Sequence, residues 1–298
     1  MTDYGHDIEF GTFITPVADP VNKAVELAIA SEEAGFDLVS FQDHPYQNTF
    51  HDTWTLMTHV AAKTRHVRIA SNVLNLPLRP PAVLARSAAT LANLSNGRFE
   101  LGIGAGGFWD GIAGMGGPRR SPGESVEALE EAIEIIRAFW ATEESGGVNY
   151  SGKHYTVSGA KRGPAPQHNI SISIGGYGPR MLRLTGRLGD GWLPSLPYLK
   201  GGPTDLESMN GHIDHGAQQA GRDPSAIRRM LNLGGQFSQT SSGFLNGPPE
   251  QWATDLAGLN ENYGISSFIL MADDPGMIEL VAREVAPATR ELIAARKS

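Results

Sequence analysis

The sequence contains no cysteine in its 298 residues. This absence excludes disulfides, thiol nucleophiles, thiolate zinc sites and cysteine-ligated iron–sulfur clusters. Because disulfides are features of oxidising compartments, a chain without cysteine fits a reducing one, and we expect a cytoplasmic protein.

The sequence also lacks long apolar runs and basic stripes. No apolar run approaches the ~20 residues of a membrane span, and the polar first residues do not resemble a signal peptide. The net charge is −8, and lysine and arginine form only short pairs such as Arg119-Arg120. Nucleic acid and membrane are therefore not expected as partners, since phosphate neutralisation supplies most nucleic-acid affinity. A small-molecule substrate is expected instead.

What the chain does have is a regular alternation of strand-like and helix-like segments. Eight such units without a composition break predict one domain over residues 1–298, an α/β protein with a (β/α)8 TIM barrel. A doubly wound sheet is the alternative, but it usually has five or six strands. The expected strands are 8–14, 37–41, 67–71, 99–103, 170–174, 191–193, 228–236 and 267–271. The expected helices are 20–34, 53–63, 81–94, 123–140, 179–188, 206–220, 249–263 and 275–294.

Two boundary features are also predicted. Asp19 is expected to cap the first helix, with Pro20 at its first position. Residues 141–169 are expected to form a long loop.

The chemistry of such a barrel belongs at the carboxyl ends of its strands. Asp43 and His44 follow the second strand, and an imidazole beside a carboxylate is a candidate for acid–base catalysis near neutral pH. A turn with a capping aspartate and a partly exposed histidine is the alternative interpretation.

Residues 72–81 follow the third strand, and they are apolar but end in prolines that cannot continue a ladder. A bulge or an unusual peptide bond fits this pattern, and an ordinary loop is the alternative.

Glycines dominate the segments after the fourth and fifth strands. Residues 102–107 are nearly stripped of side chains and lead to Phe108 and Trp109. They make a weak dinucleotide fingerprint, because no helix follows at once, but they suit a flat ring lying on the backbone. Residues 175–180 run directly into a helix, whose free amides favour a phosphate. A simple Gly-Pro turn is the alternative there.

These four segments, in this order, resemble the luciferase-like monooxygenase superfamily. The most specific parts are Asp43-His44, residues 72–83, residues 94–104 and residues 178–192. The Asp-His pair resembles the branch that uses the deazaflavin coenzyme F420, whereas FMN luciferases favour a Glu-His-His pattern.

The resemblance implies a role for each matching residue. His44 would be catalytic and would handle the proton that accompanies hydride transfer. The Asn72–Val73 link would be a cis peptide that supports the ring. The implied cofactor-binding residues are Asp43, Asn72, Val73, Asn75, Ala105, Gly106, Asp110, Tyr177, Gly178 and Arg180, the last three holding the phosphate.

The chain departs from the sugar-phosphate dehydrogenases of that branch. They carry a glutamate where this chain has Gly107, and a threonine and a lysine near the sixth strand, where it has Ser195 and Pro197-Tyr198. A glucose phosphate is therefore not the expected substrate. Phe108, Trp109, Tyr46 and Met115 favour an apolar or unsaturated one.

The sequence thus predicts an F420-dependent oxidoreductase that moves a hydride to or from a small organic substrate. An FMN-dependent monooxygenase of the same superfamily is the alternative. A cofactor-free binding partner and a metal-dependent hydrolase are less favoured, because the Asp-His pair and phosphate loop are present and no metal-ligand pattern is found. A homodimer is expected from the resemblance.

Overall fold

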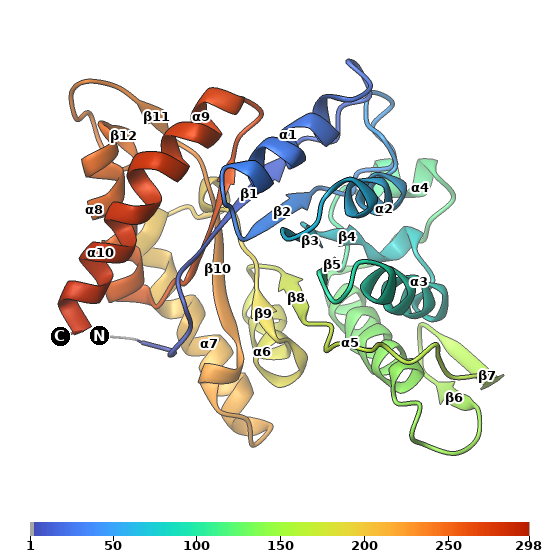
Figure 1. The fold of residues 1–298 in the computed structure, drawn as a ribbon. Helices are drawn as coiled ribbons and strands as arrows, with labels where there is room; N and C mark the ends of the chain where they lie inside the picture. The colour runs from blue at the N-terminus through green and yellow to red at the C-terminus, as the bar shows by residue number, and fades with distance from the viewer. Residues whose placement is uncertain (1–2, 298) are drawn as a thin grey trace.

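The computed structural model describes residues 3–297, and these residues fold around a closed barrel of parallel strands (Figure 1). The order of strands around the barrel follows their order in the chain, and the pairing of β3 with β5 closes the ring. This confirms the predicted (β/α)8 barrel. Its strands are β1 (Glu9–Ile14), β2 (Leu38–Phe41), β3 (Arg68–Ser71), β5 (Phe99–Gly104), β8 (Ile172–Gly175), β9 (Gly191–Trp192), β10 (Arg228–Leu233) and β13 (Ser267–Met271).

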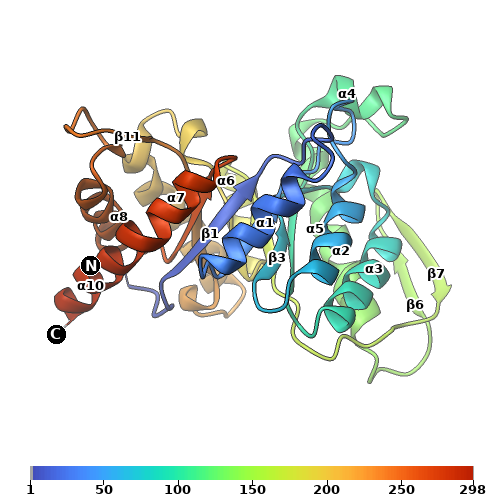
Figure 2. The same ribbon diagram turned by 45° about the horizontal axis from the view of Figure 1, so that its top comes forward.

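Helices surround the barrel, and Figure 2 shows them outside the strands. Four of them have the predicted bounds, and Asp52 caps α2 by accepting from the Thr55 amide. None of the helices between residues 3 and 297 has the length and apolar character to cross a membrane. The main helices are α1 (Lys23–Glu33), α2 (Thr53–Lys63), α3 (Pro81–Leu94), α5 (Pro122–Trp140), α6 (Pro179–Leu188), α7 (Asp205–Gln219), α8 (Pro249–Tyr263), α9 (Pro275–Leu280) and α10 (Ala286–Lys297).

The connections between the barrel strands and helices contain several short elements. A turn of π-helix over Val281–Val285 joins α9 to α10, where the sequence predicted one continuous helix. The short elements are β4 (Leu74–Asn75), α4 (Trp109–Gly114), β6 (Val148–Ser151), β7 (Thr156–Ala160), β11 (Gln236–Phe237), β12 (Asn246–Gly247) and the 3-10 turns Leu76–Leu78, Leu196–Tyr198, Gly202–Thr204 and Pro224–Ala226.

The predicted start of the first helix is wrong. The Asp19–Pro20 peptide is cis, and α1 begins at Lys23 after Asn22, which makes no side-chain cap. Pro20 therefore belongs to the turn that precedes the helix.

The predicted long loop over residues 141–169 is also wrong in part, because it contains the antiparallel hairpin β6–β7. The hairpin lies beside α5 (Figure 2). The Glu131 carboxylate of α5 accepts hydrogen bonds from the backbone amides of Lys153, His154 and Tyr155, at 2.7, 2.9 and 2.9 Å. Glu131 thus orders the hairpin, since it satisfies amides that would otherwise need water.

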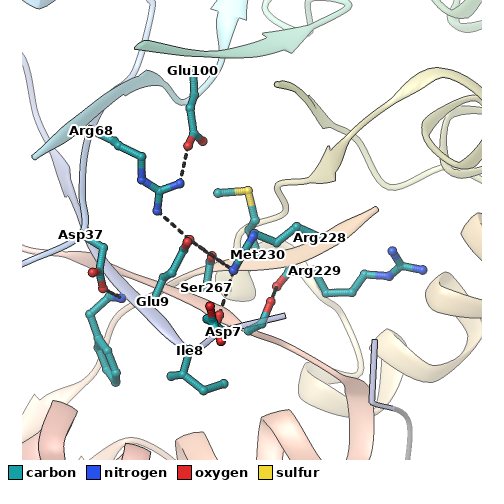
Figure 3. A network of polar contacts seen from close by, with 12 residues as sticks. Asp7, Ile8, Glu9, Asp37, Arg68, Glu100, Arg228, Arg229, Met230 and Ser267 are labelled. Atoms are coloured by element: carbon teal, nitrogen blue, oxygen red, sulfur yellow. Dashed lines mark hydrogen bonds and ion pairs between the residues drawn. The ribbon is translucent and has the colours of Figure 1, made fainter. Parts of the chain in front are cut away.

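A polar network fills the amino-terminal end of the barrel (Figure 3). The Glu9 carboxylate of β1 accepts from Arg68 at 2.8 Å, from Arg228 at 3.3 Å and from the Ser267 hydroxyl at 2.8 Å. Arg68 also pairs with Glu100. The network links strands from both halves of the ring, at the end of the barrel whose residues contribute to stability and not to catalysis.

Helices α6 and α7 cross at close range through two glycines. A Cβ atom on Gly186 would lie 2.0 Å from the Ile213 carbonyl oxygen, and one on Gly216 would lie 2.2 Å from the Arg183 carbonyl oxygen. Real side chains do not tolerate such distances, so the crossing exists only because both positions lack a side chain.

We therefore expect Gly186→Ala to lower the free energy of unfolding by about 1–3 kcal/mol or more, because the added methyl pushes the helices apart. Gly211→Ala in α7 is the matched control, since nothing lies within 4 Å of its Cβ position. That control should be neutral or stabilising by up to ~1 kcal/mol, from helix propensity. Urea denaturation measures both. Equal stabilities for the two variants would contradict the close crossing.

Candidate active site

A cavity of about 670 Å³ opens at the carboxyl ends of the barrel strands. This volume is typical of small-molecule and cofactor sites. Its wall comes from residues at or just beyond the ends of all eight barrel strands, which lie far apart in the sequence but meet at one rim. The lining includes Phe13, Thr15, Asp43, His44, Tyr46, Asn72, Val73, Asn75, Ala105, Gly106, Gly107, Phe108, Tyr177, Ser195, Tyr198, Asn232, Met271 and Asp273.

His44 is half-buried in the wall of this cavity, just beyond the end of β2. Its ring packs against those of Tyr46 and Phe108, with centroids 5.4 and 5.2 Å away. Its Nδ1 atom lies 3.2 Å from the Tyr46 hydroxyl. Burial lowers the pKa of His44 below its usual value, although the Asp43 charge opposes the shift. The imidazole is therefore neutral at pH 7 and able to accept a proton.

Tyr46 is held as a phenol. Burial raises the pKa of Tyr46 to about 12, and the Asp43 charge adds to the effect. The ring also rests on Gly111 of α4, where a Cβ would lie 2.7 Å from it. The hydroxyl thus stays protonated at neutral pH and keeps a fixed position beside His44.

Asp43 is buried, with 2% of its surface exposed, and its charge is balanced by Arg79. Arg79 Nε donates to one carboxylate oxygen at 2.7 Å and a terminal nitrogen of Arg79 donates to the other at 2.8 Å. The backbone N–H of Asn75 donates a third hydrogen bond to the Asp43 carboxylate at 2.9 Å. A buried carboxylate needs such partners, and this two-bond geometry is the strongest that arginine offers. The pair fastens the segment after β2 to the segment after β3.

The segment after β3 is the bulge that the sequence suggested. Its Asn72–Val73 peptide is cis, as the resemblance implied. The side-chain amides of Asn72 and Asn232 exchange two hydrogen bonds of 2.7 and 2.8 Å across the barrel. Both residues are buried, so the paired amides satisfy each other on the cavity floor.

Val73 lies on two neighbouring glycines. Gly104 of β5 and Gly175 of β8 are paired in register. Cβ atoms there would lie 2.6 and 3.1 Å from the Val73 methyl groups. The bulge therefore reaches into the barrel mouth only because both strands end in glycine.

Asn75 carries a polar atom without a partner. Its Oδ1 is buried and accepts no hydrogen bond from any described residue, and Asn75 lines the cavity. A buried acceptor left unpaired costs about 1–3 kcal/mol, so this atom marks a place where a ligand donor would be stabilised.

Not every residue implied by the resemblance meets at the cavity. Asp43, His44, Asn72, Val73, Asn75, Ala105, Gly106 and Tyr177 line it, whereas Asp110, Gly178 and Arg180 do not.

The three remaining residues lie outside the cavity wall. Asp110 is 97% exposed and pairs with Arg119 in a second hollow beside Phe108. Gly178 precedes α6 with nothing within 4 Å of its Cβ position. Arg180 is 58% exposed and lies 3.6 Å from Glu127 of α5.

Several lining residues were not predicted. Thr15 follows β1, Asn232 lies near the end of β10, and Met271 and Asp273 lie at and just beyond the end of β13, where the sequence shows no Asp-His pair. The rule that active sites follow strand ends is the signal that points to them. Their partners come from distant strands and are visible only in the barrel.

Comparison with known proteins assigns the family. Residues 8–241 match the family described as luciferase-like monooxygenase. The chain is 33% identical over 222 residues to an F420-dependent glucose-6-phosphate dehydrogenase of Gordonia bronchialis, a match that covers 72% of this chain and 64% of that enzyme. It is 35% identical over 199 residues to a 5,10-methylenetetrahydromethanopterin reductase of Archaeoglobus fulgidus, covering 66% of this chain and 55% of the reductase. The matched regions are thus less than two thirds of either relative.

A solved structure shows the same fold. It is described as an F420-dependent secondary alcohol dehydrogenase in complex with an F420-acetone adduct. The TM-score is 0.84 at 21% identity, with 95% of this chain and 99% of that one covered. The fold, the sequence match over most of the chain and the cavity at the strand ends agree: this chain belongs to the luciferase-like monooxygenase family.

Proposed function

We propose that this protein is an F420-dependent oxidoreductase acting on a small organic substrate in the cavity. The observation that carries the proposal is the meeting of a neutral, half-buried His44 and the unpaired Asn75 Oδ1 on one cavity wall. The F420-dependent relatives support the choice of cofactor.

The cavity suits a flat, polar-edged ring. Asn75 Oδ1 would accept from a ring N–H, which removes the cost of its burial. Ala105 and Gly106 offer a wall with almost no side chain, and Val73 supports the opposite side. The ring would therefore lie between the bulge and the segment after β5.

The anionic end of the cofactor would lie at the start of α6. This ten-residue helix begins at Pro179, and Gly178 has free space before it. Its first amides have no partner within the helix, and the helix dipole favours negative charge there. Tyr177 lines the cavity on that side, so it would connect the ring site to the phosphate site, with Arg180 adding positive charge. Asp110 would border the outer end of the channel.

Asp43 and Asn72 would act by positioning Asn75 and the bulge after β3. The Asp43–Arg79 pair holds Asn75, and the Asn72–Asn232 pair holds the bulge. We therefore propose that Asp43 contributes to cofactor binding by fixing Asn75 as well as by lining the site.

Coenzyme F420, when bound, supplies a deazaflavin ring that accepts or gives a hydride. His44 would handle the proton. If Nδ1 carries hydrogen and donates to the Tyr46 oxygen, Nε2 is left as a free acceptor. A neutral imidazole can then take the proton that an alcohol-like substrate releases as its hydride leaves. Phe108 and Tyr46 limit water around the ring and keep the imidazole in one orientation.

The substrate would be largely apolar. Phe13, Tyr46, Phe108, Tyr198 and Met271 supply most of the remaining wall. No lysine or arginine lines the cavity in residues 3–297, so a sugar phosphate would find no cation there. This supports the expectation from the sequence that glucose 6-phosphate is not the substrate.

We propose that residues 1–298 work as one barrel domain. The homodimer and the cytoplasmic location stay predictions that follow from the family resemblance and the lack of cysteine.

The choice of cofactor is tested by titrating the purified protein separately with F420 and with FMN. We expect micromolar or tighter binding of F420, with quenching of its fluorescence as the ring enters the cavity, and at least tenfold weaker binding of FMN. The reverse order of affinities would overturn the proposal in favour of an FMN-dependent monooxygenase.

His44→Ala should lower kcat by about 10²–10⁴, the usual contribution of general acid–base catalysis, and leave the Kd for F420 nearly unchanged. In the direction that releases a proton, wild-type kcat/KM should fall as the pH drops through the pKa of His44 in the free enzyme. Because burial lowers that pKa, the midpoint should lie below about 6.5. The acid limb should be missing in the variant. Near-full turnover by His44→Ala would make the histidine only part of the wall.

Gly178→Val should weaken F420 binding by about tenfold or more, because the side chain would occupy the space in front of the α6 amides. The melting temperature should change little, since nothing lies within 4 Å of the new Cβ. Unchanged affinity, measured by the same fluorescence titration, would place the phosphate elsewhere.

A further inference from the structure

The cavity has a second side that the proposed cofactor site leaves free. The cofactor residues follow strands β2, β3, β5 and β8, whereas Phe13, Thr15, Asn232, Met271 and Asp273 lie at or just beyond the carboxyl ends of β1, β10 and β13. These three strands are adjacent in the ring, so their ends form one continuous wall. The group bound there would face the ring site across the cavity.

The charge of this wall is negative. Asp43 is balanced by Arg79, but no lysine or arginine in residues 3–297 forms an ion pair with Asp273. Since no cation lines the cavity either, Asp273 gives it an unbalanced negative charge.

Asp273 is also held in place. The Thr15 amide donates to its Oδ1 at 2.8 Å, and the Thr15 hydroxyl donates to its Oδ2 at 2.7 Å. Both bonds come from the same residue at the end of β1, so the carboxylate is fixed in orientation. Each oxygen keeps a lone pair for a further donor.

Large apolar and aromatic side chains lie along the same cavity. Tyr198 is 68% exposed, Met271 is 39% exposed and Phe13 is partly buried. Such surface at a rim is available to an apolar ligand body, and an aromatic face also attracts a cation, by about 0.5–2 kcal/mol.

We propose that Asp273 anchors a positively charged group of the substrate, a protonated amine attached to an apolar or aromatic body. The ammonium donates to the free lone pairs of the clamped carboxylate, while the body packs on Met271 and Tyr198. This inference rests on the proposed function in one respect, the placement of the substrate in this cavity. It names Asp273 as the residue that selects substrates by charge, with Thr15 as its positioning residue.

The test uses three probes of one shape that differ in charge: benzylamine, benzyl alcohol and benzoate. Isothermal titration of the whole protein at pH 7.5 and low salt, with and without F420, gives their Kd values. We expect benzylamine to bind about tenfold tighter than benzyl alcohol and benzoate to bind weakest. The preference should shrink in 0.5 M salt, because a rim-exposed charge is screened.

Variants separate the local carboxylate from the overall charge. Asp273→Asn should bring benzylamine to within about twofold of benzyl alcohol, with benzyl alcohol itself unchanged. Glu279→Gln removes the same charge from the exposed surface of α9 and should keep the tenfold preference. Thr15→Val keeps the charge but loses the hydroxyl bond, so it should give an intermediate preference. Melting temperatures verify that each variant is folded.

Equal binding of benzylamine and benzyl alcohol to the wild-type protein would overturn the inference, as would an unchanged preference in Asp273→Asn. Failure to bind any of the three probes at millimolar concentration would overturn it too. These outcomes are distinguishable from failure of the proposed function, because the probe titrations without F420 need neither cofactor nor turnover. A protein that binds FMN in place of F420 can still show the amine preference.

Discussion

Closure of the parallel sheet is the constraint on which the site depends. The pairing of β3 with β5 completes a ring in which every strand points the same way. All carboxyl ends therefore lie at one rim, and residues from Phe13 to Asp273 line a single cavity. The opposite rim holds the Glu9, Arg68 and Arg228 network, so stability and chemistry are kept at different ends of the barrel.

Within that rim, pairs of buried polar side chains hold the loops in fixed positions. Asp43 and Arg79 join the segments after β2 and β3, and the amides of Asn72 and Asn232 join opposite sides of the floor. Removing one partner of such a pair would leave a charge or amide without a partner, which costs far more than the pair contributes. The arrangement explains how short loops can hold Asn75 and His44 in fixed positions without a covering domain.

The electrostatics of the cavity favour one kind of chemistry. His44 is neutral, Tyr46 stays a phenol, and cations are missing from the lining within residues 3–297. A proton acceptor beside a partly apolar space, with the Asp273 carboxylate at its edge, is consistent with the proposed hydride chemistry on an uncharged or cationic organic molecule. It does not suit phosphoryl recognition, which needs positive charge close to the substrate.

The sequence by itself determined the barrel and the bounds of α2, α3, α6 and α8, and it pointed to Asp43 and His44 as a candidate site, whereas Asn72, Val73, Asn75, Ala105, Gly106 and Tyr177 were expected only from the family resemblance. Hydrophobic periodicity, proline and glycine positions and the Asp-His pair are local signals, so they survive without a structure. The order of the hairpin β6–β7, the Asn72–Asn232 pair and the Thr15–Asp273 clamp were decided only by tertiary structure. Each depends on a partner many residues away: the hairpin is ordered by Glu131, and the clamp joins residues 258 positions apart. Such contacts form only when the ring closes, and no local pattern encodes them.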